Sequence, residues 1–328
     1  MTRAARDVIQ EDIIIVGNGA LALFAAHKAR QKGLTALMVG QGAPFERFLL
    51  LHENALRVLE GNFGEAPGHA LRGLKALNRA LAPVRRLDFA RYGLRLHAMR
   101  HTALTDFLRA RVETEALRAR VAALDAARGV ARLADGGELR ARRMVVNTAA
   151  GFVRPRLRWR HRKVFRMGFI RNPPERDWAV QINDAGTYAV IVPFGAEAAV
   201  VSSGDMAPLA RYLRQDLADI DFMELKLQTW CGLGMRQGKV VHVGEAIRRV
   251  HPHTAQGLNR GLDAIDALFE GKGLARERLH DCLMWAGGVL LDLTWGSAPR
   301  LTRASLALMD TRAGMKLASG MLLSQRRG

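Results

Sequence analysis

A glycine-rich turn between a strand and a helix constrains this chain more than any other feature. The turn, Gly17-Asn-Gly19-Ala-Leu-Ala22, follows an apolar run at 12–16 and precedes a helix and a second apolar run over 23–39. The first glycine permits the tight turn, the second lets the backbone approach a diphosphate, and Ala22 lets the helix pack closely on the strand. The helix start offers unpaired N–H groups and a positive dipole end. This order, within about 30 residues, predicts a dinucleotide-binding βαβ unit.

One expected part of that unit is absent from the sequence. An acid that grips the ribose is expected about 20 residues after the turn, where the second strand ends. The chain reads Val39-Gly40-Gln41 there. The amide of Gln41 can hydrogen-bond a ribose hydroxyl, but more weakly than a carboxylate. We therefore expect weakened binding of the adenosine half of a dinucleotide.

The remaining pattern predicts an α/β chain with an inserted sheet. Residues 160–205 contain four short runs rich in β-forming residues, separated by turn signals, which predict an antiparallel sheet. A hairpin is predicted at 129–146 around Asp135-Gly136-Gly137. Helical spacing is expected at 47–59, 102–121 and 206–230, a buried strand at 239–243, and mostly helix from 256 onward.

Composition indicates an ordinary soluble protein. Hydrophobic residues make up 49% of the 328 residues and charged residues 25%. We see no N-terminal signal segment and no apolar run long enough to span a membrane, so we expect a cytoplasmic location. The two cysteines, Cys231 and Cys282, have no metal-ligand spacing, so we expect buried thiols and no metal site.

The net charge of +19 is unusual and has three interpretations. It can reflect an arginine-rich genomic composition, an anionic substrate or carrier, or contact with an anionic membrane surface. Nucleic-acid binding is not expected, because the arginines are scattered and aromatic residues are only 6% of the chain.

A second motif lies at 243–262. It reads Gly244-Glu245 after an apolar run, then His251-Pro252, then Gln256-Gly257-Leu-Asn259. It resembles the second FAD motif of the FAD-dependent monooxygenases with the para-hydroxybenzoate hydroxylase-like fold, and is most similar to the ubiquinone-biosynthesis hydroxylase branch. In that family the acid contacts the ribityl-diphosphate region, and the following helix begins beneath the flavin. The resemblance implies FAD-binding roles for Gly244, Glu245, Gln256, Gly257 and Asn259, beside Gly17, Gly19, Ala22 and Gln41.

Three further segments resemble the same family. The segment led by Arg47 resembles a helix whose arginine approaches the FAD phosphates, although a surface arginine is an equal alternative. The segment beginning Arg100-His101 resembles the helix after the first substrate-domain strands, where we expect His101 to be a polar residue at a helix start. Ala150 replaces the aspartate that in the family supports flavin and pyridine-nucleotide binding. Use of NADPH as the electron donor is therefore an open expectation.

The resemblance covers, with gaps, residues 11–325. It implies an α/β fold with a Rossmann-like FAD-binding domain of the glutathione-reductase type, an inserted antiparallel β-sheet substrate domain and C-terminal helices. The FAD-binding domain is expected to be discontinuous. It comprises residues 1–80, 99–155 and 231–328, and the substrate domain comprises 81–98 and 156–230.

The implied activity is a flavin-dependent monooxygenase that hydroxylates an aromatic or quinone-precursor substrate through a flavin hydroperoxide. The flavin would carry the chemistry, which agrees with the lack of a recognisable catalytic triad. His253, Trp285 and Trp295 are candidate substrate residues, although core packing also suits the tryptophans. The substrate is expected to be small and aromatic or quinone-like, and either anionic or carrier-bound.

Two alternatives remain open. One is a flavin-dependent reductase or dehydrogenase of the same fold. The other is a non-redox or cofactor-poor member, namely a cyclase, an isomerase or a scaffold subunit, which Gly40 and Ala150 favour. The sequence predicts neither the substrate nor the oligomeric state, and peripheral membrane contact stays an expectation based on charge.

Overall fold

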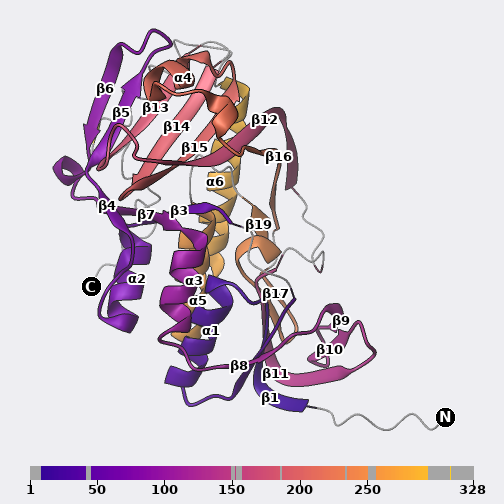
Figure 1. Cartoon of the computed structure of the whole chain (residues 1–328). Helices are drawn as coiled ribbons and strands as arrows, with labels where there is room; N and C mark the ends of the chain where they lie inside the picture. The colour runs from indigo at the N-terminus through magenta and orange to yellow at the C-terminus, as the bar shows by residue number, and fades with distance from the viewer. Residues whose placement is uncertain are drawn as a thin grey trace.

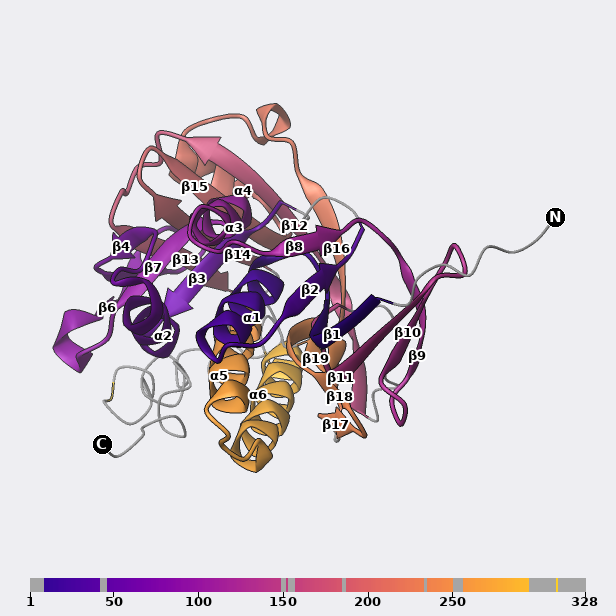
Figure 2. The ribbon, with the colours of Figure 1, turned by 90° about the horizontal axis from the view of Figure 1, so that it is seen from below.

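A computed structural model describes residues 9–41, 46–148, 152, 157–184, 187–232, 235–249, 256–294 and 311. Two large sheets lie at opposite ends of the molecule, and most of the helices lie beside the first of them (Figure 1). Seen from below, α1 (Ala20–Gln31), α5 (Gln256–Phe269) and α6 (Ala275–Thr294) lie side by side on one face of this sheet (Figure 2). Among the described helices, none combines the length and apolar character that a membrane crossing requires.

The first sheet contains the predicted βαβ unit. Its central strand β1 (Ile9–Val16) pairs in parallel with β2 (Ala36–Val39) and β11 (Glu138–Val146), and α1 connects β1 to β2. Residues 13–16 of β1 are buried on both faces, against α1 and α5 on one side and against a hairpin on the other. The other strands are β8 (Glu115–Leu117), β9 (Val121–Asp125), β10 (Val130–Leu133), β17 (Arg236–Gln237) and β18 (Val240–His242). The turn predicted at Asp135-Gly136-Gly137 joins β10 to β11.

The second sheet confirms the antiparallel region expected at 160–205. It has eight strands, and every pairing is antiparallel except the parallel pair of β5 with β13. Helix α4 (Ala207–Leu213) contributes to the apolar cluster on one face. In order across the sheet the strands are β19 (Arg248–Arg249), β16 (Met223–Cys231), β12 (Leu157–Arg171), β15 (Glu197–Gly204), β14 (Thr187–Phe194), β13 (Trp178–Asp184), β5 (Gly73–Leu77) and β6 (Pro83–Asp88).

A three-stranded sheet lies between the two large ones (Figure 1). It consists of β3 (Phe48–His52), β7 (Leu96–Arg100) and β4 (His69–Leu71). Helix α2 (Glu53–Phe63) follows β3, and α3 (His101–Arg109) follows β7. Two strands of the small sheet therefore lead directly into helices that pack beside the first large sheet.

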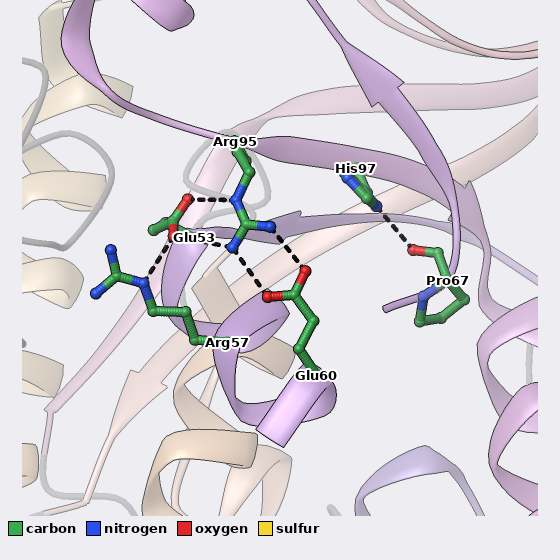
Figure 3. Close-up of polar contacts among 6 residues, drawn as sticks. All are labelled: Glu53, Arg57, Glu60, Pro67, Arg95 and His97. Carbon is green, nitrogen blue, oxygen red and sulfur yellow. Dashed lines mark hydrogen bonds and ion pairs between the residues drawn. The ribbon is translucent and has the colours of Figure 1, made fainter. Parts of the chain in front are cut away.

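An arginine directly before β7 fixes that strand to α2. Arg95 donates to both carboxylate oxygens of Glu53, each at 3.0 Å, and to both oxygens of Glu60, at 2.7 and 3.0 Å (Figure 3). Arg57 adds a 2.7 Å bond to Glu53. Burial alone would raise the pKa of Glu53, but the hydrogen bonds from Arg95 and Arg57 bring it below its usual value. The buried carboxylate is thus held ionised at the start of α2.

Three predicted helices are wrong in part. The segment 47–59 begins as β3, because residues 48–52 pair with β7, and only then becomes α2. The segment 102–121 ends its helix at Arg109, because 115–117 adds to the open edge of β2 in parallel. The segment 206–230 contains the short α4 and then β16, whose pairing with β12 extends the second sheet. In each case pairing with a distant strand overrides the local helical spacing.

Candidate functional site

A cavity of about 780 Å³ opens at the carboxyl ends of β1, β2 and β11. This is the edge at which open α/β sheets bind ligands. The cavity extends from the glycine turn to the second large sheet. Its wall combines the turn and the start of α1, residues 47–50, residues 119–122, the 244–245 turn, the start of α5 and side chains of the second sheet.

The glycine turn has the geometry that the sequence predicts. Gly17 has a φ of +145°, and an added Cβ would lie 1.7 Å from Oδ1 of Asn147 at the end of β11. Gly19 is the N-cap of α1, and the first turn of that helix carries no acidic side chain. Ala22 is fully buried and lies outside the cavity wall, as expected for a residue that lets the helix pack closely. The positive end of α1 therefore faces the cavity without a competing carboxylate.

Two predicted residues that are 198 positions apart meet in this cavity. Nη1 of Arg47 lies 2.8 Å from Oε1 of Glu245, and the two side chains are 39% and 38% exposed. Burial alone would raise the pKa of Glu245, but the charge and hydrogen bond of Arg47 bring it below the usual value. Gly244, with a φ of +56°, places Glu245 at the cavity wall. Arg47 and Glu245 therefore form a charged pair close to the glycine turn.

His101 is a cavity residue whose place the sequence did not indicate. It is the first residue of α3, is 6% exposed, and its backbone N–H donates to the carbonyl of Arg47 at 2.7 Å. Its Cε1 would lie 3.9 Å from a Cβ built on Gly19. Burial, helped by the charge of Arg47, lowers the pKa of His101 to about 4. The only signal in the sequence is the Arg100-His101 pair before a helical pattern, which does not place it beside the turn.

Unpaired nitrogen atoms surround the turn. Nε of Arg47, Nδ1 of His101 and Nδ2 of Asn147 are buried and have no hydrogen-bond partner among the described residues. All three residues line the cavity. A buried polar group without a partner costs about 1–3 kcal/mol, so such a cluster points to a ligand that supplies several oxygen atoms. A diphosphate at the start of α1 supplies them.

The end of β2 packs closely against the glycine turn at the position where an acid is expected. A Cβ on Gly40 would lie 3.1 Å from Cβ of Asn18 and 3.1–3.2 Å from backbone atoms of the glycine turn. Because the turn packs closely against this position, a side chain at position 40 would require the turn to shift by a few tenths of an ångström. The exposed Gln41 lines the cavity next to it.

The helix start predicted at the second motif is present. One of its residues lines the cavity, and another is buried between the helix and a strand. Gly257 lines the cavity at the start of α5. Asn259 does not line it: its amide accepts from the N–H of His52 and donates to the carbonyl of Leu50, both at 2.8 Å. Asn259 therefore holds β3 against α5. Trp285 lies on α6 away from the cavity wall.

Four other residues that the sequence singles out have side chains outside the part of the chain that the structure describes. The side chain of Gln256, with which α5 begins, is not among the described parts, and His253, Trp295 and Ala150 lie outside the described residues.

The second sheet gives the cavity an apolar wall. Met167, Val201 and Leu225 line it together with Phe48 of the small sheet. Gln228 and Thr229 add polar groups at one side. Such a wall suits a flat, largely apolar ring that is oriented by a few hydrogen bonds. Within the described residues no group of His, Cys, Asp and Glu could hold a metal ion.

The cavity therefore fits a dinucleotide unevenly. The start of α1, Arg47 and His101 suit a diphosphate, and the apolar wall suits a ring system, whereas the end of β2 lacks a carboxylate for the ribose.

Comparison with solved structures identifies the fold. PnpA, a p-nitrophenol 4-monooxygenase of Pseudomonas putida, superposes with a TM-score of 0.77 at 14% identity, covering 98% of this chain and 100% of that one. HpxO of Klebsiella pneumoniae, solved with FAD and uric acid, gives 0.77 at 18% identity, covering 98% of both chains. The chain has the FAD-dependent monooxygenase fold.

PqsL of Pseudomonas aeruginosa, solved with 2-aminobenzoylacetate, shares this fold with a TM-score of 0.73 at 18% identity, covering 94% of this chain and 100% of that one. No protein-family model matches the chain, and no curated protein matches it significantly in sequence. The FAD-dependent monooxygenase fold is therefore visible here in the structure and in short motifs, and not in overall sequence similarity.

Proposed function

We propose that this protein is a flavin-dependent monooxygenase that binds FAD in the described cavity and hydroxylates a small aromatic or quinone-precursor substrate. The observation that carries the proposal is the cluster of buried, unpaired nitrogen atoms on Arg47, His101 and Asn147, which lies beside the start of α1 in the same cavity as an apolar wall. Bound FAD would supply the oxygen-activating chemistry. The similarity of the fold to PnpA, HpxO and PqsL supports this class of reaction.

The chain's own residues then have distinct tasks. Gly17 and Gly19 would let the backbone approach a bound diphosphate, and Arg47 and His101, which line the same cavity, would contact its oxygens. Glu245, which pairs with Arg47, would accept a hydrogen bond from a ribityl hydroxyl. Met167, Val201 and Leu225 exclude water from the ring-binding wall, and Gln228 and Thr229 orient a substrate.

The proposal extends to three further properties of the protein. These are the closeness to the ubiquinone-biosynthesis branch, NADPH as electron donor, and the division into an FAD-binding domain (1–80, 99–155, 231–328) and a substrate domain (81–98, 156–230). A cytoplasmic location with contact to an anionic membrane surface is also proposed, on the basis of the +19 charge.

A cofactor-poor member of the fold is the second candidate, and the packing around Gly40 favours it. An acid there would press on backbone atoms at 3.1–3.2 Å, so the usual ribose contact would need a shift of the turn. In this candidate the cavity would hold a ligand without redox chemistry, as in a cyclase or isomerase.

Flavin retention separates the two candidates. Purified protein would be incubated with FAD, desalted, and its visible flavin absorption recorded for the wild type, Arg47→Ala and Arg109→Ala. Arg109 is an exposed arginine of α3 outside the cavity, and it serves as the matched control. We expect the wild type and Arg109→Ala to retain flavin, and Arg47→Ala to bind it roughly ten- to a hundredfold more weakly, because a charge-assisted contact is lost.

Oxygen uptake and product analysis would follow, with NADPH and a panel of phenols as substrates. Hydroxylated product that contains oxygen from O₂ supports the monooxygenase, and reduced product without O₂ uptake supports a reductase. A wild type that retains no flavin would refute the proposal in favour of the cofactor-poor candidate.

A further inference from the structure

The end of the cavity next to β2 carries positive charge where a ribose acid is usual. Gly40 and Gln41 form one side of this end, and residues 119–122 form the other. The two sides are joined by a hydrogen bond from the N–H of Gly40 to the carbonyl of Leu117, at 3.2 Å. Arg120 is the ionisable residue on this second side, and it lines the cavity.

Among the described residues of the cavity wall, no unpaired carboxylate offsets this charge. Glu245 is the one acidic residue among the described residues that line the cavity, and it is paired with Arg47. Arg120 is exposed and makes no ion pair in the part of the chain that the structure describes. Arg118, two residues earlier, is likewise exposed and without an ion pair among the described residues. The guanidinium of Arg120 is thus available to a ligand.

The close packing at Gly40 disfavours a carboxylate at this position. An added Cβ at position 40 would lie 3.1 Å from the turn, so a carboxylate side chain there would require its neighbours to shift by a few tenths of an ångström. A carboxylate would bind ribose hydroxyls and repel a phosphate ester. An arginine does the opposite, since its planar fork matches phosphate oxygens.

We propose that this end of the cavity binds a phosphate group esterified to the adenosine ribose, with Arg120 as the main contact and Gln41 as a hydrogen-bond donor. The inference rests on the proposed function only in placing an adenine nucleotide along α1. The ribose of the bound nucleotide would then carry a phosphomonoester in place of a free pair of hydroxyls. FAD, which has no such phosphate, then gains little affinity from its adenosine half and depends on the diphosphate and the ring.

The test uses small nucleotides with the full-length protein. Adenosine 5′-monophosphate, adenosine 2′,5′-bisphosphate and adenosine 3′,5′-bisphosphate would be titrated by calorimetry at low salt. We expect one bisphosphate to bind about tenfold more tightly than the monophosphate, since one partly exposed charge-assisted contact is gained. The position of the preferred phosphate distinguishes a 2′-phosphorylated nucleotide from a 3′-phosphorylated one. The preference should shrink as salt is raised, because exposed charges are screened.

Matched variants assign the contact. Arg120→Gln should abolish the preference while leaving the affinity for the monophosphate unchanged. Arg128→Gln alters an exposed arginine between β9 and β10 outside the cavity wall, and it should retain the preference. Equal binding of all three nucleotides, absence of any binding, or a preference that survives in Arg120→Gln would overturn the inference.

Flavin retention, measured separately, keeps this result distinct from the proposed function. Retained FAD without a bisphosphate preference refutes the phosphate subsite alone. A bisphosphate preference without retained FAD refutes the flavoenzyme and leaves the subsite standing.

Discussion

His242 should make this protein acid-labile. Its ring is 1% exposed at the end of β18, and neither nitrogen has a hydrogen-bond partner among the described residues. Burial lowers its pKa to about 4, from an ordinary value of about 6.5. The folded protein therefore keeps this imidazole neutral at a pH where the unfolded chain protonates it. Stability that is fully present above pH 6.5 is lost as the pH falls toward 4.

The size of the effect follows from the two pKa values. A difference of about 2.5 pH units, at 1.36 kcal/mol per unit, corresponds to roughly 3 kcal/mol of unfolding free energy from this one side chain. His52 and His101 are also buried with pKa values lowered to about 4. The wild type should therefore lose stability steeply below pH 6.5, and replacing one histidine should remove part of that loss.

Urea unfolding of the wild type and His242→Leu at pH 7, 5.5 and 4.5 measures this. Leucine has a similar size and does not titrate. We expect the difference in unfolding free energy between the two proteins to move in favour of the variant by about 2–3 kcal/mol between pH 7 and 4.5. Val240→Ala, in the same strand, is the control, and it should lower stability equally at every pH. Parallel pH profiles for the wild type and His242→Leu would refute the reasoning.

Three other perturbations test separate features. The wild-type affinity for FAD should rise as the pH falls from 7 to 5, by up to about tenfold per unit, because a diphosphate favours the protonated imidazole of His101. In His101→Gln the affinity should be nearly independent of pH. Fluorescence titration of FAD measures this, and identical pH profiles for the two proteins would contradict it. Arg95→Met should lower the unfolding free energy by roughly 2–4 kcal/mol, because the substitution leaves the buried Glu53 with one cation, Arg57. Urea unfolding measures this change, and a loss below about 0.5 kcal/mol would contradict the prediction. The sulfurs of Cys231 and Cys282 lie 3.5 Å apart, so hydrogen peroxide should oxidise the two thiols to a disulfide and be reduced to water. Non-reducing peptide mapping should find the two cysteines linked. Separate sulfinic acids on the two residues would count against this prediction.

Local chemistry was enough to predict the turn that positions the ligand. Gly17 and Gly19 act through backbone conformation and close approach, which depend on a few neighbouring residues. The same holds for the β10–β11 hairpin, whose turn residues specify its geometry.

Contacts between distant segments were less accessible to sequence reasoning. Residues 48–52 have apolar spacing that suits a helix, yet they form β3 because β7 offers an open edge. His101 becomes a cavity residue because the carbonyl of Arg47 fixes its backbone beside the turn. Asn259 fits the second motif in sequence, but its amide bonds to β3, and only the packing of α5 reveals this. In each of these cases the deciding partner is distant in the sequence.

The parallel pair of β5 with β13 has a consequence for synthesis of the chain. Gly73 of β5 faces Trp178 of β13, so β5 leaves the ribosome about 105 residues before the strand it must join. At ordinary elongation rates that delay is roughly 5–20 seconds. During this interval the hairpin of β5 and β6 exposes an unpaired strand edge, which is an aggregation hazard. Arg85 and Arg86 lie in this hairpin and add like charges to it. Replacing them with uncharged residues should therefore lower the soluble yield of newly made protein more than the stability of the folded protein.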